Sequence, residues 1–455
     1  MTSLSITERD TYRLISTRRN ASEILLVPVG CNWLLPTVEI LRQQRVAAQL
    51  VAEARTKLGF DGYCLFVPTT LAPAAKCPCA VMESLEQNGK APTGARWLPR
   101  GTASQCAGTK DERNAIYESL RQLDSYAGLQ ESGPFARPGW LKDLFQWAHE
   151  RVAQLGLRLT GTFQQFNASP TFALLRLETT GPAVWFKATG EPNRHELSIT
   201  LGLARLFPRH VPTIIGVHES WNAWLSTHAS GTSLDAIAET SEWERVAFEF
   251  AELQILSIAK TKELLECHCK DLRLPKLQQR IDPFCARMTE LMAAQEKQSP
   301  APLTELQLRF LGVQLKQAME LLFDVGLPDT LGHIDFNPGN ILVSPERCVF
   351  LDWAEGCLTN PLITFEYLRE HLGRSQIKDA EGEQTISAAY LRPWHSSFSP
   401  KELARARTVS PLISVFVYAV ASDTWKTADS LSNPRVAGYL RSLGRRMYRE
   451  AIRMT

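Results

Sequence analysis

The stretch LGHIDFNPGNILVSPERCVFLDW contains the residues of this chain best suited to chemistry. His333, Asp335 and Asn340 form the pattern H-x-D-x-x-x-x-N, and Asp352 follows two short apolar runs. Phosphoryl transfer needs an aligned acceptor group and divalent cations on the phosphates. Asp335 could orient or deprotonate the acceptor, and oxygen donors from Asn340 and Asp352 suit Mg²⁺. We therefore predict Asp335, Asn340 and Asp352 as catalytic residues, the last two as metal ligands, and His333 as a support for the backbone.

Each of these residues also has a simpler explanation when it is taken alone. An aspartate after a strand often caps a turn, and Asn-Pro-Gly-Asn is by itself a turn sequence. The order of the whole set, with two apolar β runs between Asn340 and Asp352, favours the chemical interpretation.

The run VWFKATG predicts a strand that carries a phosphate-binding lysine. Strand alternation places Trp185 and Lys187 on one face. A lysine on such an apolar strand is, alone, more often a snorkelling edge residue. The following helix offers Glu196, which would pair with Lys187 and fix its rotamer. Glu191 is a competing partner, and Arg194 could complicate the pairing.

A phosphate-covering turn is expected at residues 167–170, between the strand-like runs GTFQQF and FALLRLET. No G-x-G-x-x-G motif is present in the chain. Backbone N–H groups and the hydroxyl of Ser169 could contact phosphate oxygens, whereas Pro170 has no N–H to donate. A plain hairpin turn explains the same residues.

The segment AWLSTHASGTSLDAI is expected to connect the sheet to the helical part. Backbone groups near Ser226 and His228 would face the nucleotide base. Ser233 is expected to be the N-cap of the first helical turn that follows.

The positions of strand and helix patterns predict four parts. Residues 1–110 contain the strand runs EILLVPV and YCLFVP around an expected helix, PTVEILRQQRVAAQLVAEARTKLG, closed by Gly59. Residues 111–138 belong to a polar, Gly- and Ser-rich stretch that predicts a linker with one helix inside. A β-rich lobe at 139–230, opened by an amphipathic helix ending at Gly156, and a helical lobe at 231–455 complete the chain.

The composition is that of a globular protein and excludes several classes of function. The chain has 455 residues, 44% hydrophobic and 22% charged, and a formal net charge of +2. This charge gives no reason to expect nucleic acid or an anionic membrane as a partner. No apolar run reaches the roughly 18–20 residues of a membrane span, and no signal-peptide layout is present. A cytoplasmic location and no obligate protein partner are therefore expected.

Two C-x-C pairs, Cys77–Cys79 and Cys267–Cys269, are weak metal signals. Zinc sites usually space paired cysteines by about two to four residues. Reduced thiols of a large intracellular protein explain them as well.

Over roughly residues 135–455 the chain resembles the aminoglycoside phosphotransferase and choline kinase superfamily. The matching motifs are VWFKA, the helix with Glu196, HIDFNPGNILV and FLDWAEGCLTNP. The resemblance implies an α+β, bilobal protein-kinase-like fold, with ATP or GTP and Mg²⁺ as cofactors. It also implies a small-molecule acceptor that is phosphorylated on a hydroxyl. Two positions depart from the family: Ile334 replaces a common Gly, and Asn360-Pro361 replaces a common Asp-Pro.

The separate small α/β domain expected at residues 1–110 more weakly resembles a degenerate Nudix domain. In the position of the Nudix helix the chain keeps Glu53, but Ala52, Thr56 and Lys57 replace the arginine and the paired glutamates. One carboxylate beside a lysine is a poor magnesium site, so a non-hydrolytic module is expected. An unrelated α/β domain fits the residues almost equally well.

Two rival functions remain. The first is a pseudokinase, which would bind nucleotide or a partner without turnover; the presence of all the acidic residues argues against it, and the missing glycine-rich turn argues for it. The second, a Nudix-type hydrolase, is disfavoured by Thr56 and Lys57. Aminoglycosides are polycations and need an acidic pocket, so metabolic phosphorylation is preferred to antibiotic resistance. The helical lobe, where the acceptor site is expected, contains both acids and bases, so the sequence leaves the two roles open; these residues include Glu355, Glu366, Glu370, Arg369, Arg374 and Lys378.

Overall fold

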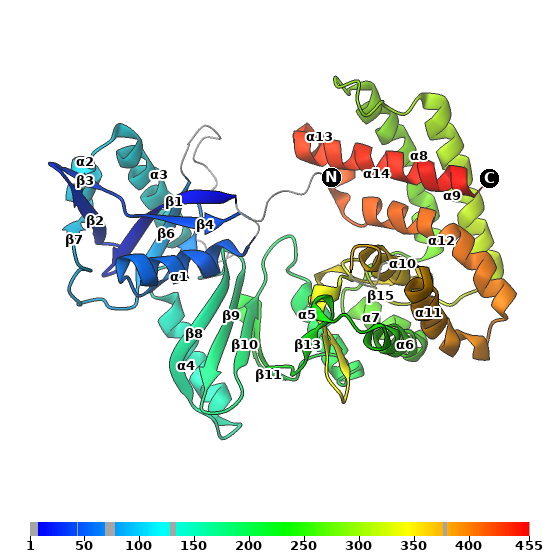
Figure 1. Cartoon of the computed structure of the whole chain (residues 1–455), viewed down its shortest axis with the longest axis horizontal. Helices are drawn as coiled ribbons and strands as arrows, with labels where there is room; N and C mark the ends of the chain where they lie inside the picture. The colour runs from blue at the N-terminus through cyan, green and yellow to red at the C-terminus, as the bar shows by residue number, and fades with distance from the viewer. Residues whose placement is uncertain (1–7, 43, 69–77, 128–132, 376–379, 455) are drawn as a thin grey trace. The chain divides into compact units, whose positions relative to one another are not determined.

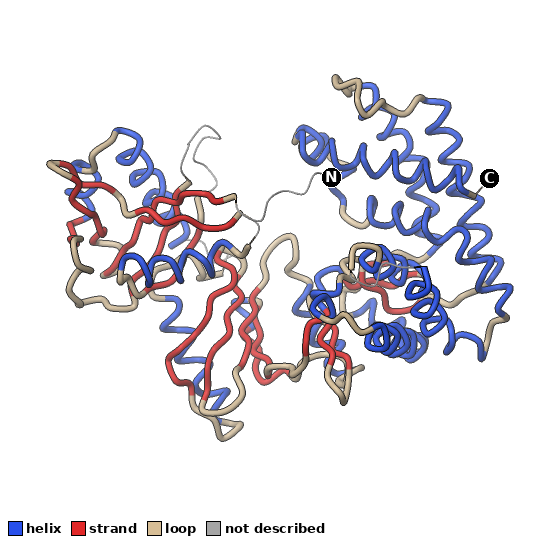
Figure 2. The backbone as a smooth tube through the Cα atoms, in the orientation of Figure 1, coloured by secondary structure: helices blue, strands red, loops and turns tan. Residues whose placement is uncertain are grey.

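The computed structural model describes residues 8–42, 44–68, 78–127, 133–375 and 380–454. The chain divides into two units, which we describe separately. The sheet unit comprises the chain up to Leu197 together with Thr213–His228. The helical unit comprises Ser198–Pro212 and Ala229–Thr455. A sheet-rich part followed by a helical part is the order predicted from the sequence, and it fits a kinase-like fold (Figure 2).

The first part of the sheet unit is a mixed seven-stranded sheet with three helices. Its strands are β1 (Arg9–Arg18), β2 (Glu23–Val29), β3 (Asn32–Leu34), β4 (Thr37–Leu41), β5 (Gly62–Phe66), β6 (Cys79–Ser84) and β7 (Arg96–Pro99). The order is β3-β2-β1-β6-β5, with β4 beside β1 and β7 beside β2, and only β1 and β6 pair in parallel. The helices are α1 (Val46–Leu58), α2 (Arg100–Cys106) and α3 (Lys110–Ala127) (Figure 1).

The helix expected to run from Pro36 to Gly59 is only half helical. Its first residues form β4, in which buried and exposed side chains alternate with the period of a strand. Helix α1 starts after Arg45 and ends at Gly59, whose φ of 61° is the left-handed cap that the glycine predicts.

The stretch expected as a linker is well structured where the structure describes it. Helix α3 forms its first part, and Ile116, Leu120 and Leu123 of this helix are buried. Helix α3 therefore belongs to the core of the sheet unit.

The second part of the sheet unit is an antiparallel five-stranded sheet. Its strands are β8 (Leu159–Ala168), β9 (Ala173–Thr179), β10 (Val184–Ala188), β11 (Ile214–His218) and β12 (Ala223–Thr227), in the order β11-β12-β10-β9-β8. Helix α4 (Trp140–Ala153) packs on β8 and β11. It ends three residues before the predicted Gly156, which lies in the following turn with a positive φ.

One buried cluster runs through both sheets, so the predicted separation of the first α/β part from the lobe that follows is not observed. The cluster includes Tyr63 of β5, Trp140 of α4 and Phe186 of β10. The Trp140 ring lies 6.0 Å from the Tyr63 ring and 6.5 Å from the Phe186 ring. Helix α1 also packs on β4, β5 and β8, which joins the two sheets on another side (Figure 1).

The helical unit packs long helices around one large apolar core. Helix α5 (Glu196–Leu206) begins in the sheet unit and continues into this one. The other helices are α6 (Thr240–Ser257), α7 (Thr261–Glu266), α8 (Leu274–Ala293), α9 (Glu305–Val325), α10 (Pro361–Leu372), α11 (Ala380–Leu391), α12 (Pro400–Val420), α13 (Ala428–Ser432) and α14 (Pro434–Arg453). Capping boxes start α9 at Thr304 and α12 at Ser399.

Two small sheets in the helical unit hold the predicted catalytic segment. One has the order β13-β16-β17 and the other β14-β18-β15. Their strands are β13 (Thr232–Ser233), β14 (Lys270–Asp271), β15 (Thr330–His333), β16 (Ile341–Val343), β17 (Cys348–Phe350) and β18 (Gly356–Thr359).

Helix α12 is long and apolar enough to cross a membrane by length and composition alone. Two thirds of its apolar window, 67%, is buried inside the protein. This burial is typical of a core helix, in agreement with the prediction that the apolar run of this helix is not a membrane span.

Candidate active site

Two strand pairings bring the ends of the predicted catalytic segment together. The pairing of β15 with β18 continues in a hydrogen bond from Ile334 N–H to the carbonyl oxygen of Glu355, 3.2 Å long. The pairing of β16 with β17 continues in a bond from Leu351 N–H to the carbonyl oxygen of Asn340, 2.8 Å long. The loop that carries Asp335 and the loop that carries Asp352 are therefore fixed to each other at both ends.

The Asp335 loop is a short, internally bonded turn. The Asn340 side chain donates from Nδ2 to the carbonyl oxygen of Asp335 at 3.3 Å. Asn337 donates from Nδ2 to Asp335 Oδ1 at 3.2 Å and accepts the Gly339 N–H at 2.9 Å. Asp335 is exposed. Because the amide nitrogen of Asn340 is used inside the loop, its Oδ1 is the atom left to bind a cation.

Asp352 has a strained backbone. Its φ of 63° and ψ of 56° lie in the left-handed region, which residues other than glycine seldom adopt. The residue before it, Leu351, is held on both sides, because its N–H bonds to Asn340 and its carbonyl oxygen contacts His333. Strain that the surroundings impose in this way is common at functional sites. Asp352 follows the last residue of β17 by two positions, and its side chain is exposed.

His333 supports the backbone next to Asp352, which is the role predicted for it. The residue is fully buried, and its Nε2 lies 3.0 Å from the carbonyl oxygen of Leu351. A carbonyl can only accept, so Nε2 carries the proton. Burial lowers the pKa of the ring below its usual value, although the hydrogen bond to Leu351 opposes the shift. The imidazole is therefore neutral near pH 7 and has no direct access to an acceptor.

The two departures from the family pattern are accommodated. Ile334 is 4% exposed and packs in the core of the helical unit, so no glycine is needed there. Asn360 caps α10 by accepting the Leu362 N–H at 3.2 Å. Its Nδ2 is buried without a hydrogen-bond partner among the described residues.

In the sheet unit, Lys187 pairs with Glu196, the partner expected from the sequence. Burial alternates along β10 as predicted, with Trp185 and Lys187 on the half-exposed face. The side chains of Lys187 and Glu196 are 14% and 2% exposed, so water screens the pair weakly. Lys187 Nζ also lies 5.7 Å from the Trp224 ring centroid and 5.9 Å from that of Phe172. Trp224 comes from β12 and Phe172 from the β8–β9 turn, and neither neighbour was predicted.

Ser169 lies in the β8–β9 turn, as expected, but its hydroxyl is already used there. Ser169 Oγ accepts the N–H of Phe172 at 2.9 Å and the N–H of Thr171 at 3.3 Å. This is a serine-stabilised hairpin turn. Contact with a phosphate would require the hydroxyl to share or exchange these donors.

Ser226 and His228 lie at the end of β12 and just beyond it. Ser226 is buried between β10 and β11, and the His228 N–H donates to the carbonyl oxygen of Ala183 at 3.1 Å. This N–H is thus occupied, and the exposed ring is the part of His228 open to a ligand. His228 Nδ1 accepts the Trp185 Nε1–H at 3.0 Å, and the two rings are nearly parallel, with centroids 6.4 Å apart. Trp185, half-buried beside His228, is a binding candidate that strand alternation alone did not single out.

The acids expected near the acceptor site are neutralised within the helical unit. Each forms an ion pair with a base: Glu355 with Lys270, Glu366 with Arg369, and Glu370 with both Arg374 and Arg446. Lys378 lies outside the described residues. Only one of these bases, Lys270, comes from a strand next to the catalytic segment.

No cluster of three or more His, Cys, Asp or Glu side chains suited to a metal occurs within the described ranges. Cys267 and Cys269 are buried, and burial raises the pKa of Cys269 to about 12, so its thiol is protonated near pH 7. Cys77 lies outside the described residues. In the Nudix-like helix, Lys57 Nζ is 2.9 Å from Glu53 Oε2, which neutralises the one carboxylate kept from that motif. The resemblance to a Nudix domain stays a prediction.

No protein-family model and no curated protein matches the chain. Among solved structures it is similar to a choline kinase from Cryptosporidium parvum, with 12% identity, 69% of this chain and 96% of that one covered, and a TM-score of 0.47. It is also similar to a choline kinase from Streptococcus pneumoniae, with 14% identity, 68% and 99% covered, and a TM-score of 0.43. A type I macrolide 2′-phosphotransferase gives 13% identity, 65% and 95% covered, and a TM-score of 0.42. Since all three TM-scores lie below 0.5, the function is argued from the residues of this chain.

Proposed function

We propose that this protein is an ATP-dependent small-molecule phosphotransferase of the aminoglycoside phosphotransferase and choline kinase superfamily. The observation that carries the proposal is the mutual fixing of the Asp335 and Asp352 loops by two strand pairings and the His333–Leu351 contact. Phosphoryl transfer depends on positioning and charge stabilisation more than on covalent chemistry by the protein. A rigid pair of acidic loops serves that requirement.

The residues present fit a magnesium site. Asn340 has its amide nitrogen bonded to Asp335, which leaves Oδ1, and Asp352 contributes an exposed carboxylate. Both are hard oxygen donors, and Mg²⁺ completes its coordination with water and phosphate oxygens. The bound ion would neutralise charge on the phosphates. We assign Asn340 and Asp352 as its protein ligands.

Asp335 acts on the acceptor. Its carboxylate accepts a hydrogen bond from the acceptor hydroxyl and aligns that oxygen with the γ-phosphorus. A bond forms between the acceptor oxygen and the γ-phosphorus while the bond from that phosphorus to the β–γ bridging oxygen breaks. The hydroxyl proton passes to Asp335 or to water, and the products are the phosphorylated acceptor and ADP.

Lys187 contacts the α- and β-phosphates in this proposal, and Glu196 holds its rotamer. Ser169 lies in the phosphate-covering turn, and Ser226 and His228 lie near the base. Trp185 joins them, because its indole N–H bonds to the His228 ring. GTP could replace ATP without any change in these roles.

The paired acids of the helical unit favour an acceptor with little positive charge. A polycation needs uncompensated carboxylates, and Glu355, Glu366 and Glu370 are each bonded to a base. We therefore prefer a metabolic alcohol, sugar or amino alcohol to an aminoglycoside. A cytoplasmic enzyme without an obligate partner fits this role.

The test is a screen of alcohols, amino alcohols, sugars and aminoglycosides for acceptor-stimulated ADP formation with ATP and Mg²⁺. We expect at least one class to raise ADP formation in the wild type and in Asp324→Asn, an exposed aspartate of α9. Asp335→Asn should abolish the stimulation. Full activity of Asp335→Asn on the same acceptor would refute the assignment.

A second candidate is a nucleotide-binding module without turnover. The observation in its favour is the β8–β9 turn, which lacks glycine and uses the Ser169 hydroxyl for its own backbone. A Mg²⁺-dependent thermal shift with ATP, without ADP formation across the whole acceptor panel, would support this candidate over the enzyme.

A further inference from the structure

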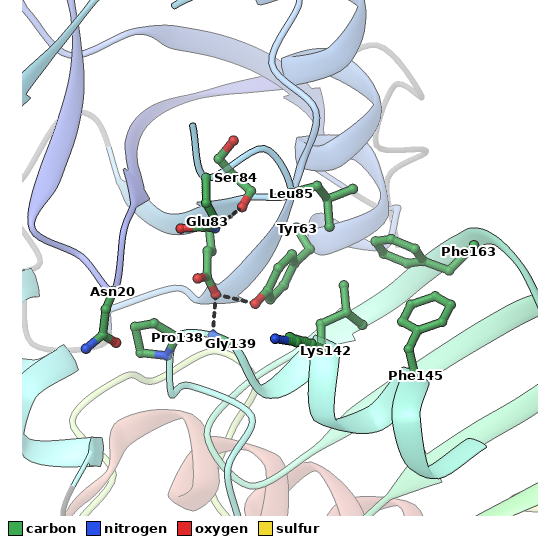
Figure 3. A pocket seen from close by; sticks show the side chains of 13 residues that line it. Asn20, Tyr63, Glu83, Ser84, Leu85, Pro138, Gly139, Lys142, Phe145 and Phe163 are labelled. Carbon is green, nitrogen blue, oxygen red and sulfur yellow. Dashed lines mark hydrogen bonds between the residues drawn. The ribbon is translucent and has the colours of Figure 1, made fainter. Parts of the chain in front are cut away.

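A pocket of about 510 Å³ lies inside the sheet unit (Figure 3). Its wall comes from four elements: β5, β6, the start of α4, and β8. Ligand pockets typically measure about 300–1,000 Å³ and are mostly apolar, with a few placed polar groups. None of the residues proposed above for catalysis lines this pocket.

One side of the pocket is apolar. It is formed by the side chains of Leu85, Leu141, Phe145 and Phe163. The rings of Phe145 and Phe163 meet edge to face, with centroids 5.9 Å apart (Figure 3). This wall suits a flat or aliphatic body and gives it no hydrogen bond.

The other side holds a buried carboxyl group. Glu83 of β6 is 3% exposed, yet its side chain lines the pocket. Its Oε2 accepts the hydroxyl of Tyr63 and, at 2.7 Å, the backbone N–H of Gly139 at the start of α4 (Figure 3). Both bonds fall on the same oxygen, and a carboxylate has about four acceptor positions on its two oxygens. Glu83 therefore keeps accepting capacity on Oε1, although the Gln87 amide lies close enough to contribute.

The charge of Glu83 lacks a cation. It takes part in no ion pair with a lysine, arginine or histidine of the described residues. Arg137 is near enough to act through space, but it pairs with Asp143. Burial raises the pKa of Glu83, which measures the cost of keeping this charge away from water. A positively charged group in the pocket would offset that cost.

We propose that this pocket binds a small organic amine, with its ammonium group at Glu83 and its apolar body against Phe145 and Phe163. The site is separate from the catalytic residues and stands whether or not the chain transfers phosphate. Lys142 lies exposed at the rim and repels cations only weakly there, because water screens it. An anion would instead have to face the buried Glu83.

The proposal is tested on the full chain by titration calorimetry with three probes of one shape: 2-phenylethylamine, 2-phenylethanol and 3-phenylpropionate. We expect the amine to bind at least tenfold more tightly than the alcohol, and the carboxylate to bind most weakly. Equal binding of amine and alcohol, tighter binding of the carboxylate, or no heat from the amine at millimolar concentration would overturn the proposal.

Glu83→Gln keeps the shape and the acceptor oxygen for Tyr63 and Gly139 while removing the charge. It should weaken amine binding at least tenfold, whereas Glu39→Gln, an exposed acid of β4, should leave it unchanged. If Glu83→Gln fails to fold, Phe163→Ala serves in its place and should weaken binding of the amine and the alcohol alike. Unchanged amine affinity in whichever variant folds would overturn the assignment.

Discussion

The imidazole of His333 and the carbonyl oxygen of Leu351 lie 3.0 Å apart in the buried interior of the helical unit. This contact ties the strand before Asp335 to the residue before Asp352. It explains how a non-glycine residue such as Asp352 is held at a φ of 63°. Two exposed acids thus depend on one buried ring for their relative position.

His333→Asn should make the stability of the protein less sensitive to acid. The pKa of His333 is lowered by burial, so the unfolded state binds more protons than the folded state between the folded pKa and the unfolded value of about 6.5. Stability contributed by the neutral ring is present above that window and is lost as the pH falls through it. Urea unfolding at pH 7 and pH 5 should show a larger loss in the wild type than in His333→Asn.

Burial also lowers the pKa of other histidines, such as His210. The free energy of unfolding therefore keeps part of its pH dependence in both proteins. The measured quantity is therefore the difference between wild type and variant. An exposed control, His395→Asn, should keep the wild-type slope. An identical pH dependence in His333→Asn would mean that His333 does not stay neutral on folding.

Asp335→Asn and Asp352→Ala should fail in different ways. Loss of a general base or an aligning carboxylate lowers turnover by about 10²–10⁴-fold, so Asp335→Asn should lose ADP formation and keep the Mg²⁺–ATP thermal shift. Asp352→Ala removes a metal ligand and should lose both. If the two variants bind Mg²⁺–ATP equally well, Asp352 is not a metal ligand.

The catalytic segment was predictable because its parts are local in sequence. His333, Asp335, Asn340 and Asp352 lie on one hairpin-like stretch, so the order of apolar runs and polar residues predicted their neighbourhood. The Lys187–Glu196 pair, nine positions apart, was found by combining strand alternation with the next helix. Only short-range geometry was needed in both cases.

Contacts between distant strands could not be predicted in this way. Trp185 bonds to His228, 43 positions away, and Gln165 bonds to Cys64, 101 positions away. Each depends on the pairing order of whole sheets. Residues 37–41 were predicted as helix because they precede a strong helical sequence, yet pairing with β1 made them a strand. The shared core of the two sheets was missed for the same reason.

Lys187→Met should reduce stability as well as nucleotide binding. The substitution removes the lysine that pairs with the buried Glu196, and breaking a buried ion pair on one side costs about 3–5 kcal/mol. The double variant Lys187→Met, Glu196→Leu should recover most of that loss, because two apolar groups replace the pair. Nucleotide affinity should stay weak in both, as measured by ATP titration. Wild-type affinity in the double variant would show that Lys187 does not contact phosphate.

Gln165→Ala should loosen the junction between the two sheets. The Gln165 amide accepts the Cys64 N–H at 2.9 Å and donates to the Cys64 carbonyl oxygen at 2.8 Å. One side chain from edge strand β8 thus satisfies both backbone hydrogen-bonding groups of a residue on edge strand β5. Truncation leaves both groups buried and unpaired, at about 1–3 kcal/mol each. Urea unfolding should show a decrease of about 2–4 kcal/mol in the free energy of unfolding. This is the lower part of the total for two groups, because the surrounding residues relax partially.

Gln164→Ala is the matched control, because Gln164 is the adjacent glutamine of β8 and is exposed. It should change stability by less than about 0.5 kcal/mol, as is usual for surface positions. Hydrogen exchange at the Cys64 amide should accelerate only in Gln165→Ala. If exchange at Cys64 and the unfolding free energy both stay at wild-type values, the two sheets are held together by their apolar core alone.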